Sequence, residues 1–319
     1  MFRPEIKVFD CTIRDGGLAN NSRFTLETVQ GVYKALCAAG IDYVELGYRN
    51  SKAMFSPDKF GPWRFCDEEM LKRVTDGVDP GTTKISIMQD AHKANADDVL
   101  PKEKSCADMI RVATYVKDVD KAIRLANNAT DKGYEATINI MSISHEGTNF
   151  LYEALQQIED ETKVAAVYVV DSFGALYSET VHYLIEKFQM YLKTKEVGIH
   201  AHNNQQLAFA NTIEGIIKGA NYVDGTLYGL GRAAGNCPLE LLLGFLKNPK
   251  FNIVPVLDVI GKVIIPLREE IEWGYTIPYM LAGILDQHPQ VSMQWVEKGG
   301  PNKHNYVEFY KLITETPEQ

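Results

Sequence analysis

The feature that most limits how this chain can fold is an alternation of short apolar segments with amphipathic helical segments, which recurs about eight times before residue 245. Apolar strands that alternate with helices are typical of parallel sheets with helical crossovers. Glycines follow several of the helical segments, at Gly40, Gly133 and Gly219, where a left-handed residue commonly ends a helix. Eight such units predict an α/β fold, a (β/α)8 TIM barrel with a small C-terminal helical extension. A doubly wound sheet is the alternative, but no Gly-x-Gly-x-x-Gly follows the first strand.

This pattern predicts a barrel domain over residues 1–248 and a helical extension over residues 249–319. In the extension we expect helices at Val254–Trp273 and Tyr279–Leu285, with Pro278 breaking the chain between them and a weaker pattern from Pro289 onward. The expected strands are Lys7–Ile13, Tyr43–Leu46, Lys84–Met88, Met109–Val112, Glu135–Ser142, Ala166–Val170, Val197–His202 and Tyr222–Thr226. The expected barrel helices include Leu26–Ala39, Val119–Lys132, Thr148–Glu159, Ser178–Leu192, Gln205–Lys218 and Pro238–Phe245.

Composition narrows the classes of partner. The chain has 319 residues, a formal net charge of −9 and a pI near 5.4, so we expect no nucleic acid and no anionic membrane as partner. No apolar run approaches the roughly 18 residues of a membrane span, and the first residues do not read as a signal peptide. The five cysteines are scattered outside any Cys-x-x-Cys spacing, which indicates free thiols in a reducing compartment. We therefore expect a cytoplasmic protein.

Polar residues gather where the predicted strands end, and this is the face on which TIM barrels carry their active sites. His200 and His202 stand two apart on a predicted strand, so both imidazoles point to the same side and form half of a metal site. Asp15, beside Arg14 at the end of the first predicted strand, offers a third ligand. Two histidines and a carboxylate suit a borderline divalent cation that keeps open positions for substrate. The alternative is that these are hydrogen-bonded barrel residues and that Arg14 only forms a salt bridge.

Three segments carry a resemblance to a known family. Asp10–Gly17 (DCTIRDGG), His200–Asn204 (HAHNN) and Gly229–Glu240 (GLGRAAGNCPLE) resemble the first-strand, metal-binding and glycine-rich segments of the HMG-CoA lyase-like enzymes, also called DRE-TIM metallolyases. Within this family, Tyr168–Leu176 (YVVDSFGAL) and Gly274–Leu285 (GYTIPYMLAGIL) look most like the 4-hydroxy-2-oxovalerate aldolases. The resemblance spans roughly residues 5–245 and implies the same barrel fold.

The resemblance implies a cofactor and its ligands. Asp15, His200 and His202 would bind a divalent cation, which could be Mn²⁺, Mg²⁺, Co²⁺ or Zn²⁺. Asn236 matches a fourth ligand of the HMG-CoA lyase branch. Arg14 would stabilise an enolate.

The implied activity is that of an aldolase-type carbon–carbon lyase, which acts on a 2-oxo acid, such as a 4-hydroxy-2-oxo acid, through a metal-bound enolate of pyruvate. Arg14, Asp15, Ser172 and His200 would contact this substrate, and Tyr279 would lie over the pocket as a catalytic group. The alternatives are an acyl-CoA-dependent Claisen-type synthase and a catalytically silent metal-binding barrel. A homo-oligomer is compatible with each of these.

One residue departs from the aldolase pattern. Those aldolases carry a general-base histidine three residues after the metal-binding aspartate, and this chain has Leu18 there. Leucine cannot move a proton, so another group must, and His145 is the candidate that we assign as catalytic, with His92 and Tyr48 as further candidates and an exposed loop position as the alternative for both histidines. The histidines expected to be structural or solvated are His182, His288 and His304.

Overall fold

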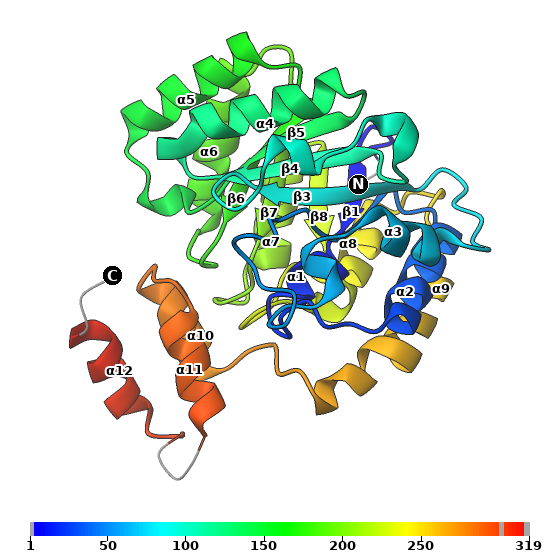
Figure 1. Ribbon diagram of the computed structural model, residues 1–319. Coiled ribbons are helices and arrows are strands. Elements are labelled where there is room, and N and C mark those ends of the chain that lie inside the picture. The colour runs from blue at the N-terminus through cyan, green and yellow to red at the C-terminus, as the bar shows by residue number, and fades with distance from the viewer. Residues whose placement is uncertain (1–2, 300–302, 316–319) are drawn as a thin grey trace.

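The computed structural model describes residues 3–299 and 303–315, and a closed barrel of eight parallel strands forms its centre (Figure 1). The order of the strands in the barrel follows their order in the chain, and β1 closes the barrel by pairing in parallel with both β2 and β8. The predicted TIM barrel is therefore confirmed. The strands are β1 (Lys7–Asp10), β2 (Tyr43–Tyr48), β3 (Lys84–Asp90), β4 (Met109–Thr114), β5 (Glu135–Ile140), β6 (Ala166–Asp171), β7 (Glu196–Ala201) and β8 (Tyr222–Gly225).

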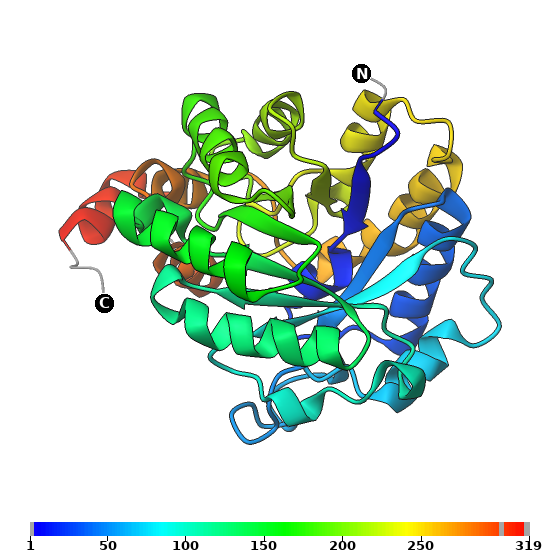
Figure 2. The same ribbon diagram turned by 90° about the horizontal axis from the view of Figure 1, so that it is seen from above.

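Helices cover the outside of the barrel, as the two views of Figures 1 and 2 show. Helix α2 matches its predicted range at both ends because its signals are local. The Thr25 side chain accepts a hydrogen bond from Thr28 N at 3.1 Å, and Gly40 ends the helix with a φ of 74°. The α-helices of this layer are α2 (Leu26–Ala39), α3 (Glu68–Thr75), α4 (Val119–Asp131), α5 (Thr148–Glu161), α6 (Ser178–Tyr191), α7 (Ala208–Ile217) and α8 (Leu239–Leu246). The 3-10 turns are η1 (Pro62–Arg64), η2 (Ala96–Asp98), η3 (Lys102–Lys104), η4 (Val116–Asp118), η5 (Ile143–His145) and η6 (Leu227–Gly229).

The first strand is shorter than predicted. It stops at Asp10, whose carboxylate accepts hydrogen bonds from Thr12 N at 3.1 Å and from Thr12 Oγ1 at 2.6 Å. This turn leads into the one-turn helix α1 (Thr12–Gly16), so Arg14 and Asp15 lie on a helix and not on the strand. The longer strand is wrong because a carboxylate that binds nearby backbone competes with the strand ladder.

The extension contains more helix than predicted. Its elements are α9 (Ile253–Val259), the π-helical η7 (Ile260–Ile264), η8 (Pro266–Glu269), α10 (Ile277–Ile284), α11 (Gln290–Lys298) and α12 (Tyr306–Glu315). Helix α9 packs beside α2, whereas α10, α11 and α12 lie on the other side of the molecule (Figures 1 and 2). None of the described helices combines the length and apolar character that crossing a membrane requires.

Three expectations for the extension are wrong. The helical stretch from Val254 ends at Glu269 and does not reach Trp273. Pro278 does not break the chain but lies in the first turn of α10, where a missing N–H removes no helical hydrogen bond. Beyond Pro289 the chain forms α11 and α12, and α12 buries Phe309 against α10. The domain boundary at residue 248 stays a prediction.

Candidate active site

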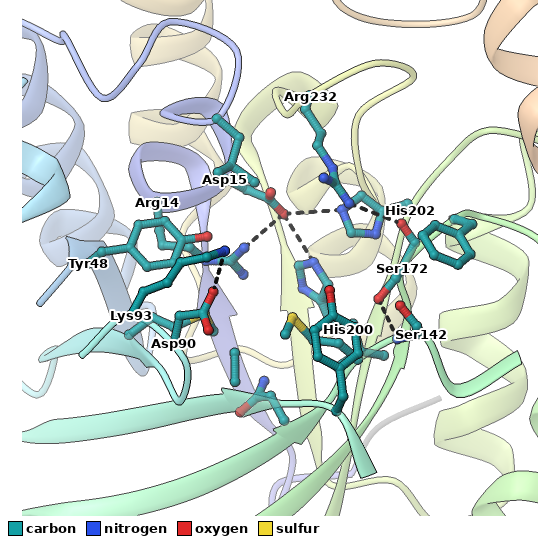
Figure 3. Close-up of a pocket in the computed structure, with 18 of the residues that line it drawn as sticks. Arg14, Asp15, Tyr48, Asp90, Lys93, Ser142, Ser172, His200, His202 and Arg232 are labelled. Atoms are coloured by element: carbon teal, nitrogen blue, oxygen red, sulfur yellow. Dashed lines mark hydrogen bonds and ion pairs between the residues drawn. The ribbon is translucent and has the colours of Figure 1, made fainter. Parts of the chain in front are cut away.

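A cavity of about 170 Å³ opens where the strands end, and its lining includes most of the predicted site residues (Figure 3). Five of the predicted residues that line it are Arg14, Asp15, Ser172, His200 and His202. They come from α1, from the loop after β6 and from the end of β7. The structure therefore brings these five predicted residues together at one cavity, and their individual roles rest on the geometry that follows.

Asp15, His200 and His202 converge on one point. Asp15 Oδ2 lies 3.0 Å from His200 Nε2 and 3.7 Å from His202 Nε2, and all three side chains are buried. Neither Asp15 oxygen and neither Nε2 atom has a hydrogen-bond partner among the described residues. Buried polar atoms are rarely left unpaired, so facing donor atoms without a partner indicate a cation site. The donor set fits a borderline divalent cation.

Further contacts fix which nitrogen of each histidine faces this point. His200 Nδ1 lies 2.8 Å from Asp224 Oδ2, and His202 Nδ1 donates to the Asp171 carbonyl at 2.9 Å. These partners leave each Nε2 lone pair directed at Asp15. Burial lowers the pKa of His202, which favours the neutral ring that a metal needs. Burial also opposes protonation of His200, but the nearby Asp15 and Asp224 carboxylates outweigh it and raise the pKa, so a cation would displace a proton there.

Asn236, which the resemblance matches to a fourth ligand, lies next to His202 but does not belong to the cavity lining. It forms an isolated bridge with His202, which brings the glycine-rich loop against the end of β7. Its Nδ2 donates to Leu230 O at 3.3 Å, while its Oδ1 is buried without a partner among the described residues. The free amide oxygen fits a cation ligand, and the role of Asn236 stays a proposal.

Arg14 is held beside the cation site by two carboxylates. Its Nε donates to Glu45 Oε2 at 2.7 Å, and its Nη1 lies 3.3 Å from Asp15 Oδ2. Burial opposes the charge, but the two carboxylates outweigh it and raise the pKa of Arg14 further, so the guanidinium stays charged. The salt bridge considered from the sequence is therefore present. It orients a planar cation toward the cavity, where an oxyanion could be stabilised.

A second arginine, which the sequence analysis did not single out, occupies the barrel interior. Arg111 on β4 is fully buried between the rings of Phe9 and Tyr168, at 4.8 and 4.4 Å from their centroids. It pairs with Glu45 at 3.2 Å and with Asp224 at 2.7 Å. Arg111 thus holds both the carboxylate that positions Arg14 and the carboxylate that orients a ligand histidine. We call the closed circuit the charge ring: Arg14, Glu45, Arg111, Asp224, His200 and Asp15.

Ser172 faces the cavity from the wall opposite Arg14 (Figure 3). Its Oγ accepts a hydrogen bond from Ser142 N at 2.8 Å, which fixes the oxygen and leaves the hydroxyl proton for a ligand. This placement fits the predicted substrate contact.

Two residues predicted as catalytic do not line the cavity. Tyr279 is buried against Ala233 and Ala234, because its place early in α10 directs the ring into the packing with the glycine-rich loop. His145 Nε2 lies 2.7 Å from the carbonyl oxygen of Asp286 and 3.3 Å from its carboxylate, on a half-exposed turn. Neither side chain belongs to the cavity lining, so nothing in the geometry supports these two catalytic assignments and both stay predictions. The alternative base His92 is also engaged elsewhere, with Asp118 at 3.0 Å.

Other cavity residues were missed. His288, expected to be structural or solvated, is exposed to solvent and also lines the cavity. Partial desolvation at the cavity wall and the neighbouring Arg232 lower its pKa to about 4, and its Nε2 lies 3.1 Å from Arg232 Nη1. Arg64 and Lys93 also line the cavity. Only Arg232 had a signal in the sequence, since it lies inside the glycine-rich segment; the others reach the site through loops and the extension.

Leu18 lines the cavity, as its alignment with the missing base would require. It packs in a small apolar cluster with Tyr48, Met88, Ala113 and Met141. This wall carries no group that exchanges protons except the Tyr48 hydroxyl. Burial is the main reason that the pKa of Tyr48 is raised, so this phenol stays protonated at neutral pH.

The fold and the site together define a TIM-barrel enzyme with a candidate divalent-cation centre at the carboxyl ends of its strands. The chain belongs to the HMGL-like family, whose model matches residues 5–259. This confirms the family expected from the three sequence segments.

The names of two similar proteins agree with a metal-dependent lyase of this family. A 4-hydroxy-2-oxovalerate aldolase of Carboxydothermus hydrogenoformans is 31% identical over 82% of this chain and 78% of its own length. An oxaloacetate decarboxylase of Mycobacterium tuberculosis is 30% identical over 76% of this chain and 70% of its own length. The predicted carbon–carbon lyase of the aldolase type is thereby confirmed as the class of this enzyme.

Solved structures match the fold. The N-terminal domain of a Bacteroides vulgatus protein, provisionally described as an aldolase, superposes with a TM-score of 0.82 at 31% identity and covers 98% of this chain and all of that domain. The HMG-CoA lyase of Brucella melitensis gives a TM-score of 0.66 at 15% identity over 83% of this chain and 99% of its own, which speaks for the fold alone.

Proposed function

We propose that this enzyme cleaves the C3–C4 bond of a 4-hydroxy-2-oxo acid to give pyruvate and an aldehyde, with a divalent cation bound by Asp15, His200 and His202 and with Asn236 as a further ligand. The observation that carries the proposal is the set of buried, unpartnered ligand atoms beside Arg14 at the barrel mouth. When bound, the cation would polarise the 2-oxo group as a Lewis acid. Its ligands admit Mn²⁺, Mg²⁺, Co²⁺ or Zn²⁺.

In this proposal Arg14 stabilises the negative charge that develops on the substrate. As the C3–C4 bond breaks, its electron pair moves toward the 2-oxo oxygen, which gains negative charge. Arg14 is charged, nearly buried and held by Glu45, so it can donate to that oxygen without reorganising. Ser172 would hold the substrate through its hydroxyl from the facing wall.

The proton of the 4-hydroxyl must move to a group other than Leu18. Tyr48 stays protonated and can donate a hydrogen bond but not accept the proton. His288 lines the cavity and is neutral at pH 7, so it can accept the proton once its Nε2 leaves the 3.1 Å contact with Arg232 Nη1. We therefore assign proton acceptance to His288, and the same proton can return to C3 of the product. A base with so low a pKa is weak, and we expect slow cleavage for that reason.

Two assays on the metal-loaded protein test this function. The first follows pyruvate release from 4-hydroxy-2-oxo acids, and the second follows deuterium exchange at C3 of pyruvate by NMR. We expect exchange and slow cleavage in the parent, and loss of both in His202→Ala with reduced metal content. His304→Ala, a histidine outside the cavity, is the matched control and should change neither. Metal bound with neither reaction detectable would refute the proposal and favour the silent barrel.

A further inference from the structure

Arg64 stands out among the charged groups of the cavity. It ends the turn η1 in the long loop after β2, and it is 7% exposed. Its guanidinium lies over three aromatic rings, at 4.9 Å from the centroid of Tyr48, 5.0 Å from that of Phe60 and 5.3 Å from that of Phe55. These three rings make cation–π contacts with the guanidinium at the wall of the cavity.

No acidic group of the described chain neutralises Arg64. No carboxylate oxygen of the described residues lies within 4.0 Å of the Arg64 guanidinium, and its buried Nε has no hydrogen-bond partner among these residues. The neighbouring carboxylate of Asp90 is engaged elsewhere, since it binds Lys93 Nζ at 2.9 Å and accepts from His92 N at 3.1 Å. By contrast, each other buried arginine of the described residues pairs with at least one carboxylate: Arg14, Arg49 and Arg111.

A buried, unpaired cation is costly for the protein alone. Removing a guanidinium from water without an anion loses hydration that aromatic rings replace only in part. Burial indeed lowers the pKa of Arg64, although arginine remains protonated. An anionic group of a ligand would supply the missing partner. The cavity also holds Arg14, Lys93 and Arg232, so it is a cationic spot in a protein of net charge −9.

Arg64 lines the same cavity as the cation site. Tyr48, which stacks on Arg64, lies on the side of the cavity that carries Arg14, Asp90 and Lys93, across from Ser172 and His202 (Figure 3). A 2-oxo acid whose head meets the cation site and Arg14 could direct its far end along this wall toward Arg64.

We infer that Arg64, supported by Lys93, binds a second acidic group of the substrate, a carboxylate or a phosphate at the end distal to the 2-oxo acid. This rests on the proposed function and specifies its substrate class: a dianionic 2-oxo acid and not one that ends in a methyl group. Cleavage would then release pyruvate and an aldehyde that carries the second acidic group.

Binding of unreactive 2-oxo acids tests the inference without turnover. Calorimetry on the metal-loaded protein compares 2-oxopentanoate with 2-oxoglutarate, which replaces the terminal methyl by a carboxylate, and with 2-oxo-4-phosphonobutanoate. We expect the parent to bind at least one acidic analogue about 10- to 100-fold more tightly than 2-oxopentanoate, the scale of a charge-assisted pair. The tighter of the two acidic analogues identifies the group as carboxylate or phosphate.

Variants locate the effect. Arg64→Met should remove the preference and leave the affinity for 2-oxopentanoate within about threefold, and Arg64→Lys should keep part of it. Arg124→Met, on the exposed face of α4, is the matched control and should keep all of it. Thermal melts establish that each variant is folded.

Three results overturn the inference: no preference in the parent, an unchanged preference in Arg64→Met, or no binding of any of the three acids. The proposed function can fail separately. If the Arg64-dependent preference is found but the protein neither exchanges pyruvate C3 protons nor cleaves any 4-hydroxy-2-oxo acid, the anion subsite stands and the aldolase assignment falls.

Discussion

Replacing Arg111 by methionine tests the charge ring most directly. The change keeps an unbranched side chain between Phe9 and Tyr168 but removes the cation that joins Glu45 to Asp224. Glu45 loses its ion pair with Arg111 but keeps the one with Arg14 at 2.7 Å, so its charge remains partly neutralised. Asp224 then keeps the His200 imidazole at 2.8 Å but no cationic side chain among the described residues, and it is almost completely buried.

The expected loss of stability is large. Breaking a buried ion pair from one side costs about 3–5 kcal/mol, because the remaining charge has no partner and little water. Loss of the cation–π contacts adds about 1 kcal/mol. Burial raises the pKa of Asp224, but Arg111 and His200 outweigh it and hold the pKa at about 2. A carboxylate whose pKa is lowered by folding stabilises the folded state at any pH above its pKa in the unfolded chain. The contribution of Asp224 is therefore present above about pH 4 and is lost as the pH falls toward 2.

Urea unfolding at pH 7, monitored by circular dichroism, measures the loss. We expect Arg111→Met to lower the free energy of unfolding by about 4–6 kcal/mol, and the double variant R111M/D224N to recover part of it, since the amide removes the stranded charge. A loss below about 1 kcal/mol, or a double variant no more stable than the single one, would mean that Arg111 is not held by these carboxylates as described. Exposed Arg124→Met serves as the control and should stay within about 0.5 kcal/mol of the parent.

Three further predictions concern the cavity. Chelation should lower the melting temperature as well as abolish activity, because a cation at 100 times its dissociation constant stabilises the fold by about 2.7 kcal/mol. A melting temperature that changes neither on exhaustive chelation nor on readdition of Mn²⁺ would contradict a site at Asp15, His200 and His202. Arg14→Lys keeps a charge but loses the planar fork bound to Glu45, so turnover should fall by about 10²–10³ with the fold intact, and a lysine variant as active as the parent would exclude the oxyanion role. Leu18→His places an imidazole in the apolar wall beside Tyr48 and should raise cleavage of 4-hydroxy-2-oxo acids by about 10²–10⁴; Leu18→Asn, polar but not basic, should not, and equal gains in both would point to a wider cavity instead of a new base.

The sequence predicted those parts of the molecule whose signals are local. The Leu26–Ala39 helix was matched at both ends because Thr25 and Gly40 mark its termini. His200 and His202 were placed on one side of their strand by spacing alone, and the barrel then brought Asp15 to them.

What the sequence could not predict depends on contacts between distant segments. His288 reaches the cavity only because the extension folds back beside the barrel mouth. The hydrophobic periodicity of the sequence does not predict where the extension packs. Arg111 looked like an ordinary residue of a predicted strand, and only the closed barrel shows the two carboxylates that hold it. Tyr279 and His145 lie outside the cavity lining because local contacts hold them elsewhere, and their positions in the sequence do not reveal those contacts.

The cavity is built from two kinds of parts, and this has a consequence for how such an enzyme can change over generations. Asp15, His200 and Arg14 belong to one closed electrostatic circuit, so altering any of them disturbs the rest. Arg64 stands outside it, on the long loop after β2. Substitutions in that loop can change which acid is bound while the carbonyl chemistry is kept, so descendants of this enzyme can acquire new substrates and retain the reaction.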